Sequence, residues 1–298
     1  MIRQSIVLIT KTSSDYELLD CGQEEKLERF GDIVLSRPDP QALWKKQLPE
    51  NIWRQAKGSF VHDIQTGNKD HGGWSLGEAI PSRWPISLGG LKFWIKPTPF
   101  KHVGLFPEQI PNWEWLKEKI MAIPSAEILN LFGYSGGATL ACAQAGAKVV
   151  HVDSSKSAIA WAKENAELSS LFDKPIRWIL EDARSFVHRE IKRGRKYQGI
   201  IMDPPAFGHG YQGELWKIEE DLIPLIDDCL KLLAPEPIFF LINGYSSGYS
   251  SIAYANNISV LEKTYKGSLE MGELTIAESG PTGRLLPAGI FARWSMSY

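Results

Sequence analysis

Short apolar runs alternate with longer amphipathic segments from residue 111 onward. Runs that are apolar at every position are typical of parallel strands covered by helices on both faces. Segments whose apolar residues recur every three or four positions are typical of those helices. The pattern predicts strands over residues 128–132, 148–152, 176–180, 199–202 and 237–242, helices from 111 and over 140–145, 157–168, 183–193, 215–233 and 252–264, and closing strands over 273–277 and 290–294. We therefore expect a doubly wound α/β fold, mostly parallel, with an antiparallel closing strand.

Residues up to about 100 follow another pattern. Short candidate strands over 5–10, 32–35, 59–61 and 91–95 are separated by turn-forming stretches. This part also contains Trp44, Trp53, Trp74, Trp84 and Trp94. Such rings stack on bases in some proteins, but more often they fill the thin core of a small β-rich unit. We predict a small β-rich substrate-recognition domain over residues 1–100 and an α/β domain over residues 101–298.

Composition narrows the classes of protein. Hydrophobic residues make up 43% and charged residues 23% of the chain, and the formal net charge is -2. A disordered chain is excluded, and no global positive field attracts nucleic acid. The three cysteines, Cys21, Cys142 and Cys229, are far apart and have no nearby histidine, so we expect neither a metal site nor a disulfide. No apolar stretch is long enough for a membrane span, and we expect a cytoplasmic protein.

A glycine-rich turn follows the first strand of the α/β region, at Phe132-Gly133-Tyr134-Ser135-Gly136-Gly137. The dinucleotide-binding fingerprint requires glycine at its third position, where Ser135 stands, so that interpretation is weak. The same residues satisfy the G-x-S-x-G pattern of a hydrolase nucleophile, Ser135. The only histidine beyond Asp203 is His209, a few residues later, and this spacing fits a hydrolase poorly.

A third interpretation is an adenosyl site, because acids end the next two predicted strands. Asp153 could accept both ribose hydroxyl protons, and Asp182 could accept from the adenine amino group. A lone acid in such a place is more often a helix cap, but two at successive strand ends favour a binding edge. The fourth strand ends in Asp203-Pro204-Pro205-Ala206-Phe207, at the same edge.

Together these ordered motifs resemble the class I S-adenosylmethionine-dependent methyltransferases, which have a Rossmann-like fold. In detail they are similar to the family of large-subunit ribosomal RNA methyltransferases and their uncharacterised relatives. The likeness includes Lys101-His102-Val103-Gly104-Leu105-Phe106-Pro107-Glu108-Gln109 before the first helix, and residues 283–294 near the end.

The resemblance implies S-adenosylmethionine as cofactor and no metal. It assigns the cofactor to Gln109, Phe132, Gly133, Tyr134, Ser135, Gly136, Gly137, Asp153, Ser154, Asp182, Ala183 and Asp203. It assigns the target base, which relatives flip out of its stack, to Asp203, Pro204, Pro205 and Phe207. Proline carbonyls could accept from an amino group, Phe207 could stack on the base, and Asp203 could orient the substrate or take a proton.

Relatives that make 5-methylcytosine use a cysteine after the fifth strand, where this chain has residues 240–248 without one. We therefore expect methylation of a nucleobase nitrogen in RNA of the ribosomal kind. A small molecule or protein as acceptor, or a non-catalytic S-adenosylmethionine-binding module, stays an alternative. Oligomeric state cannot be predicted from these features.

Overall fold

The computed structural model describes residues 4–62, 72–99, 101–245, 248–280 and 283–297. Contacts divide the chain into two compact units. One consists of Met1–Leu8, Pro111–Leu274 and Gly289–Tyr298, and the other of Ile9–Ile110 and Thr275–Ala288. The units are interleaved along the chain, and the division into domains over residues 1–100 and 101–298 stays a prediction.

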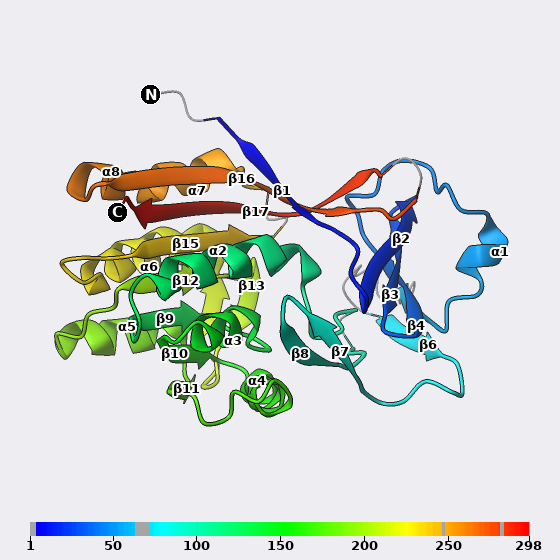
Figure 1. Cartoon of the computed structure of the whole chain (residues 1–298), viewed down its shortest axis with the longest axis horizontal. Coiled ribbons are helices and arrows are strands. Elements are labelled where there is room, and N and C mark those ends of the chain that lie inside the picture. Colours follow the sequence, from blue (N-terminus) through cyan, green and yellow to red (C-terminus); the bar gives the residue numbers. More distant parts are fainter. Residues whose placement is uncertain (1–3, 63–71, 100, 246–247, 281–282, 298) are drawn as a thin grey trace. The chain divides into compact units, whose positions relative to one another are not determined.

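An eight-stranded sheet forms the centre of the first unit, with strand order β1-β16-β17-β15-β12-β9-β10-β11 (Figure 1). Its strands are β1 (Ile6–Thr10), β9 (Glu127–Leu131), β10 (Lys148–Asp153), β11 (Ile176–Leu180), β12 (Gly199–Met202), β15 (Phe239–Gly244), β16 (Gly267–Ala277) and β17 (Leu285–Met296). Strands β9 to β12 and β15 pair in parallel, and β17 pairs antiparallel to β15. The predicted α/β fold with an antiparallel closing strand is confirmed.

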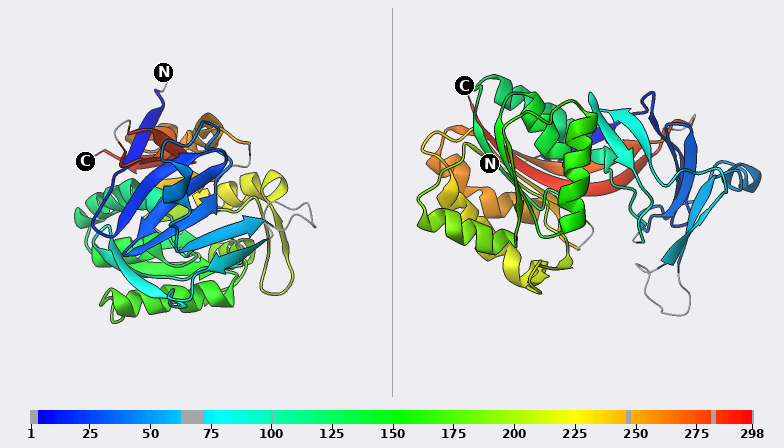
Figure 2. Two further views of the ribbon diagram at one scale, coloured as in Figure 1. Left: turned by 90° about the vertical axis from the view of Figure 1, so that its right-hand side faces the viewer. Right: turned by 90° about the horizontal axis from the view of Figure 1, so that it is seen from below.

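Successive residues of the central strands serve opposite faces of this sheet. Leu129 and Ile200 belong to one hydrophobic cluster, whereas their neighbours Ile128 and Ile201 belong to another. Because side chains alternate along a strand, only strands that are apolar at every position can fill two cores. The covering helices are α2 (Ile110–Met121), α3 (Gly137–Gln144), α4 (Lys156–Leu168), α5 (Ala183–Lys192), α6 (Ile218–Leu232), α7 (Ser251–Ile258) and α8 (Val260–Thr264). Helices α2 and α3 pack on one face, and α5, α6 and α7 on the other (Figure 2).

The strand order reverses at β9, which lies between β10 and β12. Chains leaving two neighbouring strands there diverge to opposite faces and leave a crevice at the carboxyl ends of the strands. The glycine turn follows β9, Asp153 ends β10 and Asp203 follows β12. The topology therefore brings these predicted segments to one edge.

The second unit is β-rich, as predicted. Its elements are β2 (Tyr16–Gly22), β3 (Glu25–Phe30), β4 (Ile33–Pro38), α1 (Glu50–Trp53), β5 (Gly58–His62), β6 (Gly72–Leu76), β7 (Trp84–Leu88), β8 (Leu91–Ile95) and the 3-10 turn η1 (Pro107–Gln109). Arg284 joins residues 275–288 to this unit through an ion pair of 2.8 Å to Asp20 and a hydrogen bond of 2.8 Å to the Cys21 carbonyl. Buried Trp53 and Trp84 support the core interpretation of the aromatic residues.

One predicted helix is wrong at its start. Residues 215–217 form strand β14 (Leu215–Lys217), which pairs antiparallel with β13 (Phe207–His209), and α6 begins only at Ile218. The side chain of Asp221 accepts the Lys217 N–H at 2.8 Å, which favours an extended backbone before the helix. The resulting β13–β14 hairpin was not expected from the sequence.

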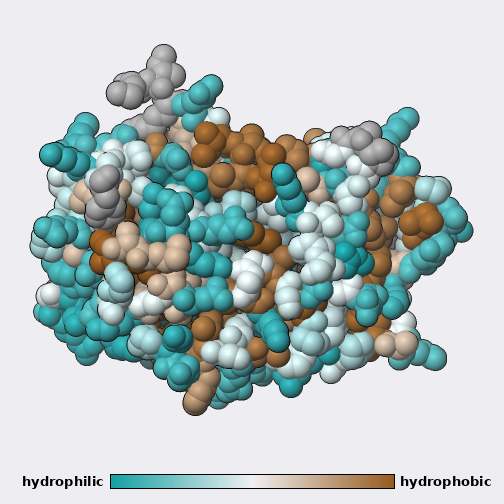
Figure 3. All heavy atoms as spheres, viewed as in Figure 1, coloured by the Kyte–Doolittle hydropathy of each residue, from teal (hydrophilic) through white to brown (hydrophobic). Residues whose placement is uncertain are grey.

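Hydrophilic residues spread over the face of the molecule in Figure 3, with hydrophobic residues exposed in small groups between them. Among the described residues, no helix is long and apolar enough to cross a membrane.

Candidate functional site

The glycine turn has an unusual backbone conformation. Phe132 and Tyr134 have φ values of 58° and 46°, and Gly136 has 92°. Non-glycine residues in this left-handed region cost about 1–3 kcal/mol each and cluster at functional sites. The Gly133 N–H donates to the Val152 carbonyl at 3.0 Å, which ties the turn to strand β10. Helix α3 begins at Gly137 directly afterwards, with its free N–H groups at this edge.

A buried polar cluster supports the turn from below. The Asn130 amide donates to the Thr139 hydroxyl at 2.8 Å, and that hydroxyl lies 2.8 Å from Nδ1 of His151. All three side chains are buried. Burial lowers the pKa of His151 to about 3, so its imidazole is neutral near pH 7.

Asp153 connects this turn to the end of β10. Its carboxylate accepts the Tyr134 N–H at 2.8 Å and the Ser155 N–H at 2.7 Å. Burial raises the pKa of Asp153, and the two N–H donors oppose that effect. Each carboxylate oxygen has a second acceptor site, so two ribose hydroxyls could still donate to it.

Asp182 caps helix α5, as a lone acid after a strand often does. Its carboxylate accepts the N–H groups of Arg184 and Ser185 at 2.9 and 3.1 Å. It also pairs with the Arg184 guanidinium at 3.0 Å. The neighbouring Glu181 pairs with Arg189. Both acids therefore have structural partners, which fix their positions at the sheet edge.

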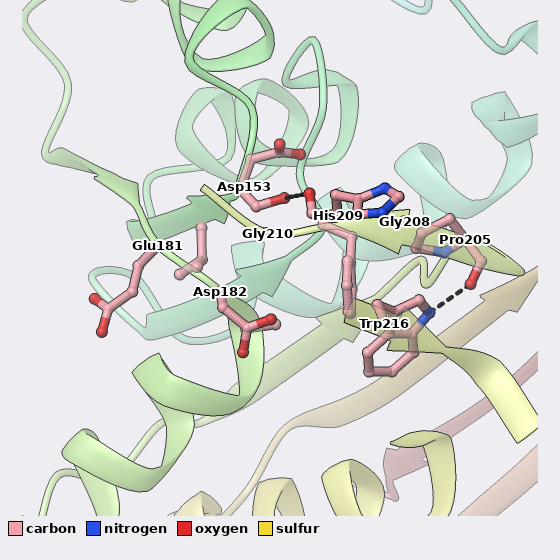
Figure 4. A pocket seen from close by; sticks show the side chains of 12 residues that line it. Asp153, Glu181, Asp182, Pro205, Gly208, His209, Gly210 and Trp216 are labelled. Carbon is pink, nitrogen blue, oxygen red and sulfur yellow. Dashed lines mark hydrogen bonds between the residues drawn. The ribbon is translucent and has the colours of Figure 1, made fainter. Parts of the chain in front are cut away.

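A hollow of about 350 Å³ lies between these strand ends (Figure 4). The hollow is partly open to solvent, and this volume includes the solvent space at its mouth. Its lining residues are Phe132, Val152, Asp153, Ser154, Glu181, Asp182, Ala183, Pro205, Gly208, His209, Gly210 and Trp216. The predicted ribose and adenine acids thus face one hollow, from neighbouring strands.

Four lining residues, Gly208, His209, Gly210 and Trp216, come from the unexpected β13–β14 hairpin. The Ser154 hydroxyl donates to the His209 carbonyl across a long contact of 3.5 Å, drawn as a dashed line in Figure 4. The glycines and Tyr211 between residues 207 and 217 were the available turn signal. That signal was missed because Leu215 and Trp216 also fit the apolar spacing of the following helix.

The Asp-Pro-Pro segment leaves β12 at the edge of the hollow. Asp203 is half-buried and has no hydrogen-bond or ion-pair partner among the residues that the structure describes. Burial alone raises its pKa to about 6. The Pro205 carbonyl already accepts one hydrogen bond, from the Trp216 indole N–H at 2.6 Å. Phe207 is 57% exposed, and its ring meets His209 edge-on at 5.2 Å.

The hollow does not include every predicted site residue. The turn from Gly133 to Gly137 adjoins it through the Tyr134–Asp153 bond without lining it, and Asp203, Pro204 and Phe207 also lie outside the lining. Gln109 belongs to the other compact unit, and its assignment to the cofactor stays a prediction. Ser135 is only 4% exposed, whereas a hydrolase nucleophile stands free at the top of its turn.

The donor set of this edge fits an adenosyl cofactor. Paired acids at successive strand ends, a strained turn and a helix N-terminus meet the needs of a ribose, an adenine and an amino-acid carboxylate. In the described part of the chain, no group of three or more His, Cys, Asp or Glu side chains could hold a metal ion.

Comparison with known proteins yields several methyltransferases. Residues 125–235 match the sequence model of a family described as RNA cap guanine-N2 methyltransferase. The SAM-dependent methyltransferase from Agrobacterium tumefaciens, known from a crystal structure, has 39% sequence identity to this chain. The match has a TM-score of 0.91 and covers 100% of this chain and 98% of that chain.

Two curated relatives are ribosomal RNA methyltransferases. Large subunit methyltransferase K of Neisseria meningitidis serogroup B is 30% identical over 54% of this chain and 46% of its own length. Large subunit methyltransferase K/L of Pseudoalteromonas atlantica is 27% identical over 93% of this chain and 39% of its own length. The chain thus spans less than half the length of either relative.

Proposed function

Because this chain belongs to the S-adenosylmethionine-dependent methyltransferases, we propose that it methylates a nucleobase nitrogen in ribosomal RNA. The single observation that supports a nitrogen as the methyl acceptor is Asp203, directly after β12. Its carboxylate is half-buried and has no partner among the residues that the structure describes. A nitrogen nucleophile must lose a proton as it gains a methyl group, and such a carboxylate can receive it.

The cofactor supplies an electrophilic methyl group on a sulfonium. In our proposal Asp153 accepts from the ribose hydroxyls and Asp182 from the adenine amino group. Phe132 and Ala183 line the adenosine side with Ser154. The turn from Gly133 to Gly137 holds the methionine end, where the start of α3 favours a carboxylate.

Bound S-adenosylmethionine would supply the methyl group to the acceptor nitrogen and would leave as S-adenosylhomocysteine. The Asp203 carboxylate would take the proton that the nitrogen loses. The pKa of about 6 suits this task, because the group is ionised near pH 7 and still accepts a proton readily. The Pro204 carbonyl can hold the amino group, and the exposed Phe207 ring can stack on the base.

The cysteines support nitrogen over carbon as acceptor. Cys21, Cys142 and Cys229 are all buried, and burial raises the pKa of each thiol. A covalent attack on a pyrimidine ring needs an accessible thiolate. These three residues do not meet that need, which leaves direct displacement by a nitrogen.

The names of the relatives support RNA as the substrate. The matched family is described as acting on guanine N2 of an RNA cap, and both curated relatives are named for large-subunit ribosomal RNA. Methylation of ribosomal RNA would take place in the cytoplasm. We propose further that the β-rich unit selects the RNA, since a net charge of -2 leaves no general attraction for phosphates.

The test is incubation with S-adenosylmethionine and ribosomal RNA from cells that lack the protein, followed by mass spectrometry of nucleosides. We expect one methylated base with the wild type, none with Asp203→Ala, and the wild-type amount with Asp173→Asn, which changes an exposed acid. Methylation of a small molecule or protein instead, with RNA untouched, would refute the RNA proposal. Methylation at carbon would refute the role of Asp203.

A further inference from the structure

Besides the long Ser154–His209 contact, two side chains, Trp216 and Arg184, connect the β13–β14 hairpin to the site. We propose that these are positioning residues that couple the cofactor side of the site to the Asp-Pro-Pro segment. The proposal rests on the function proposed above and adds residues for which the sequence pattern gave no role.

Trp216 fixes the acceptor side. It is 3% exposed, and its indole N–H donates to the Pro205 carbonyl at 2.6 Å (Figure 4). The same ring packs against Phe132, with centroids 5.0 Å apart. Phe132 belongs to the strained turn after β9, so one indole contacts both the cofactor turn and the substrate segment. A proline carbonyl held this way has little freedom to rotate.

Arg184 extends the connection to the acid proposed for adenine. Its guanidinium pairs with Asp182 at 3.0 Å and with Asp221 at 2.7 Å, and it donates to the Leu215 carbonyl at 3.0 Å. It also lies over the Trp216 ring at 5.7 Å. Only a planar group with several N–H donors can bond at once to Asp182, to the Leu215 carbonyl of the hairpin and to Asp221 of α6.

The chain of contacts is continuous from cofactor to acceptor. It passes from Asp182 through Arg184 to the hairpin, and from Trp216 of that hairpin to Pro205. Asp221, the far partner of Arg184, also accepts the Lys217 N–H at 2.8 Å. The hairpin is a short two-stranded ribbon, which is marginally stable alone, so these contacts determine its position.

Two substitutions separate this role from general stabilisation. Trp216→Phe keeps an aromatic ring but removes the hydrogen bond to the Pro205 carbonyl. Arg184→Gln removes the guanidinium and its contacts with Asp182, Asp221 and the Leu215 carbonyl. We expect each to lower kcat at least tenfold while the Kd for S-adenosylhomocysteine changes less than threefold. Arg184→Lys keeps the positive charge but lacks the planar guanidinium, so its kcat should be about as low as that of Arg184→Gln. Arg193→Gln, an exposed arginine just beyond the same helix, is the matched control.

Hydrogen exchange on the full chain supplies a readout that needs no acceptor. In the wild type, S-adenosylhomocysteine should slow amide exchange across residues 207–217, the Lys217 amide included. Trp216→Phe and Arg184→Gln should lose most of this slowing at Lys217 and retain it in α3. Trp216→Phe carries the test if Arg184→Gln does not fold.

The outcomes are distinguishable. If the wild type methylates no RNA, the proposed function fails, and hydrogen exchange still decides whether the two residues couple the site. If both variants keep wild-type exchange at Lys217, or if they keep kcat within twofold on the acceptor, the positioning role is refuted.

Discussion

The α-carbon of Gly133 faces the imidazole ring of His151, so closely that an added methyl group would lie 2.4 Å from Cε1. The ring is fully buried and held by Thr139, so it has no room to withdraw. Glycine is required at this position by a close approach to a side chain from the neighbouring strand.

Gly133→Ala should therefore displace the turn or the ring and weaken S-adenosylmethionine binding at least tenfold. Overpacking of this kind also costs about 1–3 kcal/mol of stability. Calorimetric titration and thermal melting measure the two effects. Gly73→Ala is a control, because an added methyl group there meets nothing within 4 Å. Unchanged affinity in Gly133→Ala would show that the turn does not hold the cofactor.

The raised pKa of Asp203 predicts that kcat depends on pH. Its pKa of about 6 means that the carboxylate required as proton acceptor is lost as the pH falls below 6. We expect kcat to rise between pH 5 and pH 7 with a midpoint near 6, measured under saturating substrates. Asp203→Asn should lower kcat by about 10²-fold or more and abolish this midpoint. A midpoint that persists in the variant belongs to another group.

The same carboxylate predicts an opposite effect on stability. The pKa of Asp203 is raised above the value of 3.8 for the free side chain. Its contribution to the free energy of unfolding is therefore largest below pH 4 and is lost as the pH rises through 6. Near pH 7 the buried charge costs about 1–3 kcal/mol. Asp203→Asn should accordingly unfold at a higher temperature than the wild type at pH 7.5. A lower melting temperature would indicate that the carboxylate has a stabilising partner.

Asp153 should matter for the cofactor and not for the acceptor. Its substitution by alanine removes an acceptor for the Tyr134 and Ser155 N–H groups and for the proposed ribose bonds. Loss of charged hydrogen bonds of this kind costs about 1–3 kcal/mol, so the Kd should rise roughly 5- to 150-fold. Calorimetry measures it. Glu164→Ala on the next helix is a control for lost charge, and equal Kd values in the two variants would remove Asp153 from the site.

Thiol reagents should leave the activity intact. Cys21, Cys142 and Cys229 are each 0% exposed, and burial raises the pKa of each thiol, so little thiolate is available to an alkylating agent. We expect the native protein to keep full activity after iodoacetamide, while the urea-unfolded chain takes up three labels by mass spectrometry. Rapid inactivation of the folded protein would support a thiol nucleophile after all.

The parts of the fold that the sequence predicted share one property. Strands such as Ile176–Leu180 and Gly199–Met202 are short, mainly apolar runs between helical segments. Their bounds match the prediction because the hydrophobic pattern and the length of each run both indicate a strand. The acids at the ends of β10 and β11 could be located for a related reason, since the carboxyl ends of parallel strands lie at one edge of the sheet.

What the sequence did not reveal depended on partners distant along the chain. Strands β2 and β3 went unpredicted because charges interrupt them, yet Glu28 is fully buried. It accepts from the Tyr16 hydroxyl at 2.8 Å and pairs with Arg37 at 2.6 Å. The pairing of Leu215 with His209 likewise overrides a helical pattern. Neither interaction leaves a local signal.

Strands β16 and β17 each begin or end in one compact unit and continue into the other. A gene cut near codon 100 would therefore deprive the β-rich part of residues 275–288, and with them the Arg284 ion pairs. Neither fragment should be recovered intact from such a truncation. Exchanging the β-rich unit between homologous enzymes requires four junctions, near residues 9, 110, 275 and 288, so recombination at a single point would produce hybrids that do not fold.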